Sequence, residues 1–538
     1  MIRLDIVQGS TTVELQGRGI TPLDYVPVAP TEQSTVETPT ISDGGLVGSI
    51  LYKDVPETFS ILLKGKTRED IQTKFDTLGR IFRGIRDTPT YAVYHSGFPG
   101  SRVWRSPLNR AVFKHEDSIK VTQKGAYCVV TIAWERKYYW EDNTLQTLRL
   151  SNSYGSRTTS PIPVRNGKTQ LAGSAGITFR IEAGTGRLKY AAGGLEIFTS
   201  GMPIEIQGST DGNDGFYTVD FPGATVSQML TTFFADEAAH AGLVVTSACP
   251  QNYVDVLGSD IEGAIPAPVR FEYFNTYNSV FRTYDIMVGQ NVFGSPLTSP
   301  FLLEAENAVV GGTVGPAVGN TDVFSGGFYS SVTLGVDHLL FDLTAAQVSM
   351  MKGQYYRILV HLTTAAPAET WMKVQTRAYT GLTVLEETGF VLLATTGWPV
   401  YDLGVVQIPP GLKGYDNLVG YSIDIITKDG TGSVVREVLV DYVLLMPVTG
   451  WRKLTPLGFY LAYTGNSIDD NIEGSVYYSG SGDALVDADR LSISVASGPP
   501  LMVYPKVTQR YYVFVTGAYD VRRTGTVRIQ YRPRVTVL

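Results

Sequence analysis

Hydrophobic and polar positions along the chain follow two different periods. From residue 67 onward, apolar residues recur at steps of three and four, at Ile71, Phe75, Leu78, Ile81, Phe82 and Ile85. This spacing predicts one amphipathic helix whose apolar stripe packs on another element. Thr67, with Asp70 three residues later, is typical of a helix N-cap.

Elsewhere apolar residues alternate with polar ones or form short runs, which predicts strands. Near the helix these runs are Phe59–Leu63, Tyr91–Tyr94, Arg110–Phe113 and Tyr127–Trp134. We therefore expect a domain in which one helix covers a β-sheet. The segment 27–45 is polar and rich in Thr, Pro and Ser, and predicts either a contact-making arm or a surface loop.

The predicted fold class is mainly β and multi-domain. It comprises an N-terminal β-sheet domain with one packed helix, a small inserted β-module, and C-terminal jelly-roll or β-sandwich domains. The 538 residues exceed what one core holds, and the 56 Gly, 31 Tyr and 22 Phe favour strands and tight turns. The predicted boundaries are 1–168 plus about 250–295 for the first domain, 169–249 for the insert, 296–450 for the sandwich, and 451–538 for a terminal β region that either continues the sandwich or returns to the core.

Charge and cysteine content exclude several classes. The net charge of −7 is mild, and the interspersed signs argue against a nucleic-acid-binding surface. Cys128 and Cys249 are expected to be free thiols in a reducing compartment rather than a disulfide. No apolar run reaches the roughly 20 residues of a membrane span, and the start lacks a hydrophobic signal region, so neither membrane insertion nor Sec-type export is expected.

The sequence shows no catalytic constellation. Its five histidines are scattered without metal-ligand spacing, and the common nucleophile, zinc and phosphate-binding motifs are missing. Asp402, Asp416 and Asp424 lie near aromatic residues, which leaves a glycosidase pair open, although turns and exposed faces are the favoured explanation. We therefore expect a protein that is not an enzyme.

Three local patterns resemble the distal tail protein family of long-tailed, siphovirus-like phages. The first is the strand–helix–strand block with Phe59-Ser-Ile-Leu-Leu-Lys-Gly and its aromatic exit from Trp134 to Glu141. The second is Asn252-Tyr-Val-Asp-Val followed by Ile261-Glu-Gly-Ala-Ile-Pro-Ala-Pro-Val-Arg. The third is the module around Asn213-Asp-Gly-Phe-Tyr-Thr-Val. Together they cover roughly the first 290 residues.

The resemblance implies a virion structural protein at the tail tip, or baseplate, assembled in the host cytoplasm. Its partners would be copies of itself in a ring, commonly a hexamer, together with the tail tube protein and the tip hub proteins. No catalytic residue is carried over from the family. The residues expected to support this assembly are Ile71, Phe75, Leu78, Phe82, Trp134 and Trp140.

The segment from Phe301 to Val448 resembles carbohydrate-binding modules of the jelly-roll kind. In such modules an acid of the first strand and one of the last hold a structural calcium ion. By analogy Glu304 or Glu306 with Asp441 would hold calcium here, and two exposed edge acids are the equal alternative. No other cofactor is expected.

The same resemblance makes host-surface polysaccharide a candidate partner. The residues that would stack on a sugar face are Trp371, Trp398 and Tyr401, although burial of each ring is the more frequent outcome. Two other functions stay open: a carbohydrate-active enzyme, motivated by the aromatic and Asp content of residues 396–424, and a non-enzymatic glycan-binding adhesin.

Overall fold

The chain folds into two compact units in a computed structural model. The first unit comprises Met1–Gln146, Glu262–Ala267 and Tyr531–Leu538, and the second comprises Thr147–Ile261 and Pro268–Gln530. The structure describes residues 3–17, 19–23, 25–37, 46–96, 101–115, 118–152, 155–165, 170–172, 177–182, 185–190, 203–207, 209–213, 215–221, 226–229, 244–247, 253–275, 283–292, 302–316, 328–351, 353–364, 366–378, 383–393, 400–408, 420–431, 436–456, 466–479, 494–517 and 524–538.

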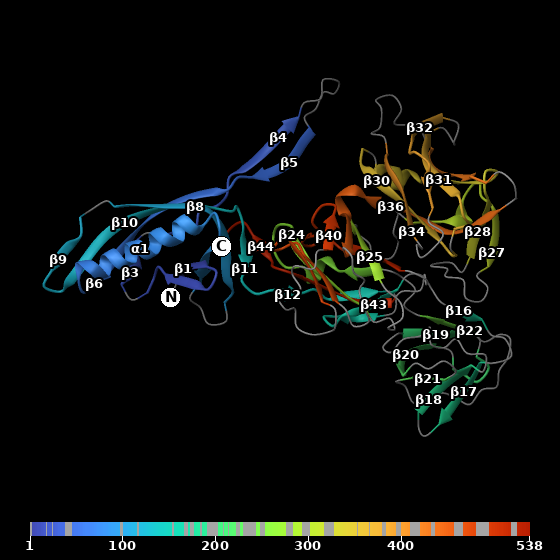
Figure 1. Cartoon of the computed structure of the whole chain (residues 1–538), viewed down its shortest axis with the longest axis horizontal. Helices are drawn as coiled ribbons and strands as arrows, with labels where there is room; N and C mark the ends of the chain where they lie inside the picture. Colours follow the sequence, from blue (N-terminus) through green and yellow to red (C-terminus); the bar gives the residue numbers. More distant parts are fainter. Residues whose placement is uncertain are drawn as a thin grey trace. The chain divides into compact units, whose positions relative to one another are not determined.

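The first unit is a ten-stranded antiparallel sheet with one α-helix packed on it (Figure 1). The sheet order is β2-β1-β7-β8-β10-β6-β3, with β9 beside β10 and β11 between β8 and β44. These strands are β1 (Arg3–Gln8), β2 (Thr11–Glu14), β3 (Ile20–Pro22), β6 (Val55–Gly65), β7 (Thr90–His95), β8 (Val103–His115), β9 (Lys120–Thr122), β10 (Gly125–Arg136), β11 (Trp140–Asp142) and β44 (Arg534–Val535).

The predicted amphipathic helix is confirmed as α1 (Arg68–Gly84). Thr67 caps it in a full capping box, because its hydroxyl accepts from the Asp70 amide while the Asp70 carboxylate accepts from the Thr67 amide. The apolar stripe is buried and packs on β6, β8 and β10. The predicted strands next to the helix are also present, as parts of β6, β7, β8 and β10.

Strand β8 changes neighbours along its length. Its first part, Val103–Pro107, pairs with β7 on one edge, and residues 104 and 105 pair with β11 on the opposite edge. Its second part, from Leu108 to His115, pairs with β10, which precedes β11 in the chain. Among the described residues, no strand pairs with the other edge of this second part. The sheet therefore has an open edge at Leu108–Lys114.

Strands β4 (Glu32–Glu37) and β5 (Leu46–Tyr52) form a hairpin of their own. Within the described part of the chain, this two-stranded sheet pairs with no other strand, and Figure 1 shows it as a separate ribbon. The sequence predicted an arm or a loop over 27–45, and the structure has the strand β4 inside this range. The polar composition of this range did not indicate a strand, because apolar and polar residues do not alternate there.

The end of the chain returns to the first unit. In β44, Val535 pairs with Trp140 and Arg534 with Glu141. The Arg534 guanidinium donates to the Glu141 carboxylate at 3.1 Å and lies over the Tyr139 ring at 3.7 Å. Residues from opposite ends of the sequence thus complete one sheet.

The second unit contains two seven-stranded sheets built from distant segments. One has the order β12-β43-β24-β38-β39, with β15 beside β43 and β41 beside β24; the other has the order β14-β13-β23-β42-β25-β37-β40. Their strands are β12 (Gln146–Thr147), β13 (Leu150–Asn152), β14 (Gly155–Thr158), β15 (Ile162–Arg165), β23 (Tyr253–Val256), β24 (Ala267–Asn275), β25 (Thr283–Val292), β37 (Trp451–Pro456), β38 (Asn466–Asp470), β39 (Ser475–Ser479), β40 (Ser494–Ser497), β41 (Met502–Val503), β42 (Gln509–Gly517) and β43 (Thr524–Tyr531).

This pairing differs from the expected boundaries. Residues 147–165 and most of 253–292 were assigned to the first domain, but they belong to two sheets that also contain strands after residue 450. Strands β12 and β15 pair with β43, and β23, β24 and β25 pair with β42, β38 and β37, respectively. Only Glu262–Ala267 joins the first unit. The terminal region therefore returns to strands that precede the sandwich instead of continuing it. Strands that are so far apart in the sequence show no local pattern from which their pairing could be predicted.

A third seven-stranded sheet of the second unit holds the expected insert. Its order is β16-β22-β19-β20-β21-β18-β17. The strands are β16 (Gln170–Ala172), β17 (Ile177–Glu182), β18 (Thr185–Tyr190), β19 (Pro203–Gln207), β20 (Gly215–Phe221), β21 (Val226–Met229) and β22 (Val244–Ser247).

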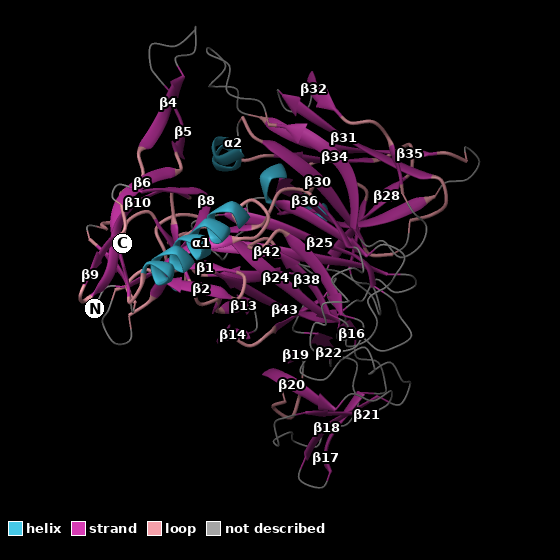
Figure 2. Cartoon of the chain, turned by 60° about the vertical axis from the view of Figure 1, so that its left-hand side comes forward, coloured by secondary structure: helices cyan, strands magenta, loops and turns pink. Residues whose placement is uncertain are grey.

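The sandwich of the second unit has a six-stranded and a five-stranded sheet around one core (Figure 2). The six-stranded sheet contains β26 (Leu302–Glu304), β27 (Thr313–Pro316), β28 (Phe328–Thr333), β30 (Tyr355–Leu362), β34 (Val400–Gln407) and β36 (Glu437–Pro447). The other contains β29 (His338–Asp342), β31 (Thr370–Ala378), β32 (Thr383–Glu387), β33 (Val391–Leu392) and β35 (Tyr421–Asp429).

Short helices complete the described structure. They are α2 (Ala345–Met351) and the 3-10 turns η2 (Gly258–Asp260), η3 (Ala305–Asn307) and η4 (Val448–Gly450). The predicted class, mainly β with several domains, is confirmed. Within the described residues, no helix has both the length and the hydropathy needed to cross a bilayer.

Candidate functional site

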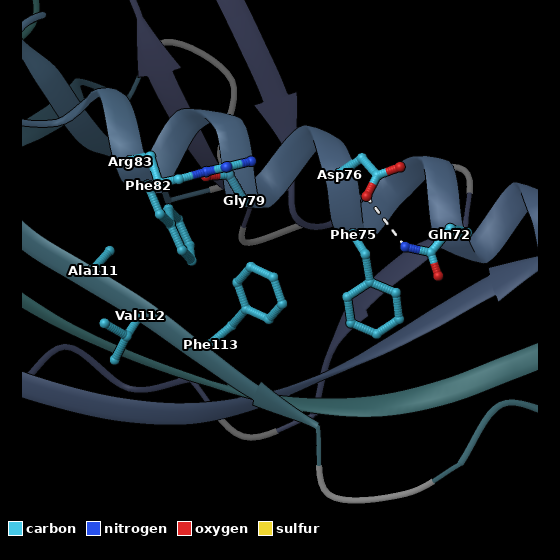
Figure 3. A pocket seen from close by; sticks show the side chains of 9 residues that line it. All are labelled: Gln72, Phe75, Asp76, Gly79, Phe82, Arg83, Ala111, Val112 and Phe113. Atoms are coloured by element: carbon cyan, nitrogen blue, oxygen red, sulfur yellow. Dashed lines mark hydrogen bonds between the residues drawn. The ribbon is translucent and has the colours of Figure 1, made fainter.

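A groove of about 490 Å³ lies between α1 and β8 in the first unit (Figure 3). Three phenylalanine rings form its apolar part: Phe113 from β8 lies 5.7 Å from Phe75 and 5.9 Å from Phe82, between ring centroids. The complete lining is Gln72, Phe75, Asp76, Gly79, Phe82, Arg83, Ala111, Val112 and Phe113.

The groove exists because a glycine interrupts the apolar stripe of the helix. Phe75, Gly79 and Phe82 follow each other at steps of four and three, so they share one face of α1. A Cβ at Gly79 would lie 3.6 Å from the Phe113 ring, in ordinary contact. Hydrogen there instead leaves a gap beside the ring. An isolated glycine inside a helical pattern is the sequence signal that would have indicated this site.

The rim of the groove is polar. Gln72 donates from Nε2 to the Asp76 carboxylate at 3.1 Å, as the dashed line in Figure 3 shows. Arg83 donates from Nε to the Gly79 carbonyl oxygen at 3.0 Å. Both pairs lie one helical turn apart on the exposed side of α1. The groove therefore has an apolar floor and a polar rim.

The open edge of β8 runs directly beside this groove. Val112 is 47% exposed there, although it is a large apolar residue. Arg110 and Lys114 are also exposed along the same edge. An unpaired strand edge presents backbone donors and acceptors to any strand that approaches it.

A buried carboxylate fixes the chain on the N-terminal side of the β4–β5 hairpin. Glu57 accepts hydrogen bonds from the Tyr25 hydroxyl at 3.1 Å, the Val28 amide at 2.9 Å, Trp134 Nε1 at 2.7 Å and Arg136 Nε at 2.9 Å. Burial, with the negative charge of Glu57 nearby, raises the pKa of Tyr25 far above its usual value. The segment entering the hairpin is thus fastened to β6 and β10.

The C-terminal side of the hairpin is fixed by aromatic stacking. The Tyr52 ring, at the end of β5, stacks on Tyr138 with centroids 5.4 Å apart, and Tyr138 meets Tyr139 edge-on at 5.2 Å. Offset or edge-on aromatic pairs stabilise by about 0.5–1.5 kcal/mol beyond their burial. Both ends of the hairpin are therefore anchored to the first unit.

The residues expected to support assembly lie inside the first unit. Ile71, Phe75, Leu78, Phe82, Trp134 and Trp140 all belong to its core and are at most 8% exposed. Burial shows that they hold the unit together, and a part in assembly stays a prediction for them. Phe75 and Phe82 also line the groove. The outward-facing residues that the sequence did not indicate are Gln72, Asp76, Gly79, Arg83 and Val112.

The expected sugar-stacking residues do not share one face. Trp371 is half-buried on β31 of the five-stranded sheet, opposite Leu392. Tyr401 lies on β34 of the six-stranded sheet and is 6% exposed, and its burial raises its pKa to about 12. Trp398 lies outside the described residues. Of the two described rings, Trp371 is the one presented to solvent.

The expected calcium ligands lie near one another along the six-stranded sheet. Glu304 pairs with Tyr442, the neighbour of Asp441, and Glu306 follows in η3. The Asp441 carboxylate is fully buried and lies 2.9 Å from His361 Nδ1. Burial also raises the pKa of Glu306. Calcium binding by these acids stays a prediction, because the imidazole already partners Asp441 and the described residues contain no group of three His, Cys, Asp or Glu placed to hold a metal.

The other candidate carboxylates are also engaged. Asp424 is fully buried with one oxygen 2.6 Å from His338 Nδ1, and Asp402 forms an ion pair with Arg357. Asp402 and Asp424 lie on different sheets of the sandwich, in β34 and β35. Asp416 and Cys249 lie outside the described residues, and Cys128 is a buried free thiol.

Comparison with known proteins gives structural likeness only. No protein-family model matches the chain, and no curated protein matches it. The crystal structure of the Dit protein of phage SPP1, described as a paradigm of the hub adsorption apparatus in phages infecting Gram-positive bacteria, is 12% identical over 46% of this chain and 95% of that chain, with a TM-score of 0.21. Two structures of the phage p2 baseplate in its activated conformation, with strontium and with calcium, are each 9% identical over 46% of this chain and 98% and 97% of theirs, with TM-scores of 0.22 and 0.21. Scores this low do not establish a common fold.

Proposed function

We propose that the chain is a structural protein of a phage tail tip, of distal-tail type. Its first unit joins copies into a ring, commonly six-fold in this family, between the tail tube and the tip hub proteins. The proposal rests on the three sequence patterns that resemble this family. The structural observation that supports it is the unit built from the first of these patterns, in which a helix covers a sheet that keeps one edge open.

An open edge beside an anchored hairpin suits assembly rather than catalysis. Subunits that meet through two different surfaces form a closed ring when the rotation between them closes. Closure also removes unpaired strand edges, which otherwise favour aggregation. The ring would thus satisfy the backbone groups that β8 leaves exposed.

Imaging tests this function directly. Recombinant full-length protein is examined by negative-stain electron microscopy, and purified virions are labelled with an antibody against the second unit. We expect rings in the first sample and label at the tail tip in the second. A chain that stays monomeric at every concentration and a tail tip without label would overturn the proposal.

We further propose that the β-modules of the second unit contact host-surface glycans, with Trp371 stacking on a sugar face. Its partial exposure on β31 supports this choice. The test is adsorption of virions carrying Trp371→Ala, compared with Tyr355→Ala on the other sheet, where Tyr355 is 55% exposed. We expect slower adsorption with the first change alone. Equal adsorption removes Trp371 as a stacking residue, and oligosaccharide released from host polysaccharide would favour an enzyme instead.

A further inference from the structure

The half-buried Trp371 ring lies close to the sheet at the start of β31. The pairing of β31 with β35 places Lys428 opposite Trp371, and Gly430 follows two residues later on the same strand face. A Cβ added to Gly430 would lie 3.0 Å from Trp371 Nε1, which is tighter than most real contacts. The indole therefore occupies the space that a side chain at position 430 would need. A ring that covers a glycine of the sheet turns its other face to solvent, where a sugar ring can stack.

Glu369 stands beside this ring in a strained backbone conformation. Its φ is +55°, in the left-handed region that non-glycine residues rarely adopt. Among the non-glycine residues that the structure describes, only Lys506 shares this property. The Gly430 amide donates to the Glu369 carbonyl oxygen at 3.0 Å and so holds this backbone in place. Strained residues persist where the surrounding structure fixes them, and they cluster at ligand sites.

The Glu369 carboxylate lies next to the indole. The point that is 3.0 Å from Trp371 Nε1, where a Cβ of Gly430 would be, is also 3.0 Å from Glu369 Oε2. Glu369 is exposed, so a ligand can reach its carboxylate from solvent. The two oxygens of one carboxylate can accept hydrogen bonds from two adjacent hydroxyl groups. A sugar that stacks on the indole would place such hydroxyl groups at its edge.

The charges around the ring indicate the class of sugar. Lys428 is exposed and positive, whereas Lys373 is paired with Glu387 at 2.6 Å. Together with Glu369, the described charges around Trp371 balance. An anionic ligand would be attracted by Lys428 and repelled by Glu369, so the surface favours neither sign of charge. It suits an uncharged sugar, to which the Lys428 ammonium donates and from which the Glu369 carboxylate accepts.

We propose that Trp371, Glu369 and Lys428 form one subsite for an uncharged pyranose unit that carries two adjacent hydroxyl groups. The inference rests on the proposed glycan contact, and it names the class of sugar and the residues that select it. The pyranose ring stacks on the indole, and its hydroxyl groups donate to the Glu369 carboxylate. Gly430 is a positioning residue, because it lets the indole lie close to the sheet.

Fractionated host polysaccharide tests the class of sugar. Wall polysaccharide of the host strain is separated by anion exchange into a neutral and an anionic fraction, and binding of each to the full-length protein is measured by biolayer interferometry. We expect the neutral fraction to bind, with an affinity that changes by less than about twofold between about 50 and 500 mM salt, because no net charge is neutralised. Three results would each overturn the subsite: binding of the anionic fraction alone, an affinity that falls by about tenfold at high salt, or binding of neither fraction.

Releasing the strain at Glu369 separates binding from folding. Glu369→Gly removes the carboxylate and introduces a residue that adopts positive φ freely, so we expect an equal or higher melting temperature and an affinity for the neutral fraction that is lower by about tenfold or more. Glu369→Gln, which keeps the size of the side chain, should also weaken binding. Lys506→Gly is the matched control, because Lys506 is exposed and has a φ of +63°; its affinity should equal that of the wild type. Wild-type affinity in both Glu369 variants would contradict the role of this carboxylate.

A methyl group at Gly430 tests the position of the ring. Gly430→Ala should displace the indole and weaken binding of the neutral fraction, whereas Gly389→Ala in the same sandwich should not, because a Cβ there meets nothing within 4 Å. If Trp371→Ala weakens binding while the changes at Glu369 and Gly430 do not, the glycan contact stands and the subsite is overturned. Unchanged binding by Trp371→Ala overturns both, and imaging decides the tail-tip role separately.

Discussion

At the scale of single residues, the buried Glu57 carboxylate joins segments of the first unit that are far apart in the sequence. Its carboxylate accepts from four donors, and its ion pair with Arg136 is wholly buried. The Arg136 guanidinium also lies 4.6 Å from the Trp140 ring centroid. A buried charge of this kind is tolerated only while its partner stays in place.

Glu57→Gln should therefore destabilise the first unit by about 3–5 kcal/mol, because it leaves Arg136 buried without a counter-charge. Urea unfolding followed by tryptophan fluorescence measures the change. Glu135→Gln on β10 is the control, since its half-exposed side chain predicts a change within about 0.5 kcal/mol. Equal effects from both substitutions would show that the buried pair is unimportant.

The Asp70 carboxylate makes the stability that the helix cap contributes depend on pH. Its carboxylate accepts from the Lys66 and Thr67 amides, which lowers its pKa below the ordinary 3.8. A lowered folded-state pKa gives stability that is present above the unfolded pKa and is lost as the pH falls through the folded value. Asp70→Asn should therefore be less stable than the wild type well above pH 3.8, and the gap should shrink well below it. A gap that stays constant with pH would contradict this role.

At the scale of elements, the sequence predicts the helix α1 itself but not the groove beside it. The stripe and the Thr67 cap were predictable because helix period and capping chemistry are local. The groove was not, since Phe113 reaches it from β8 and only Gly79 marks the gap. The hairpin strand β4 was also missed, because five of its six residues are polar (Glu, Gln, Ser, Thr and Glu), and only Val36 is apolar. The calcium and sugar candidates came from resemblance alone and stay predictions.

Gly79→Ala should stabilise the first unit by about 0.5–1 kcal/mol, because alanine loses less backbone entropy in a helix and its Cβ would meet Phe113 at 3.6 Å, an ordinary contact. Gly84→Ala, in the same helix, is the control: a Cβ there would lie 3.0 Å from Gln8, so its gain should be smaller. Thermal unfolding ranks the two. A larger gain at Gly84 would contradict the packing described for α1.

At the scale of the whole molecule, the chain passes between its two units several times. Glu262–Ala267 and Tyr531–Leu538 belong to the first unit although the residues before each belong to the second. Such exchange explains why boundaries drawn from composition along the chain differ from those of the structure. Boundaries drawn from composition assume that residues close in the sequence belong to the same domain. The sheets of this protein instead pair strands that are hundreds of residues apart in the sequence.

Calcium binding by the sandwich can be tested on the intact protein. If Glu304, Glu306 and Asp441 hold the ion, a chelator should lower the melting temperature of the sandwich, because a ligand bound only by the folded state stabilises it by about 2.7 kcal/mol at a hundred times its dissociation constant. Asp441→Asn should then abolish the response to calcium. Identical melting curves with and without chelator would remove the ion from this site.

The pairing of β44 with β11 sets an order on synthesis. Glu141 is made early, but its partner Arg534 leaves the ribosome only after the intervening second unit has been translated. The sheet that begins the chain is therefore among the last parts to be finished. A polypeptide truncated before residue 534 would lack this strand and the contact of the Arg534 guanidinium with the Glu141 carboxylate, so the sheet of the first unit would stay incomplete.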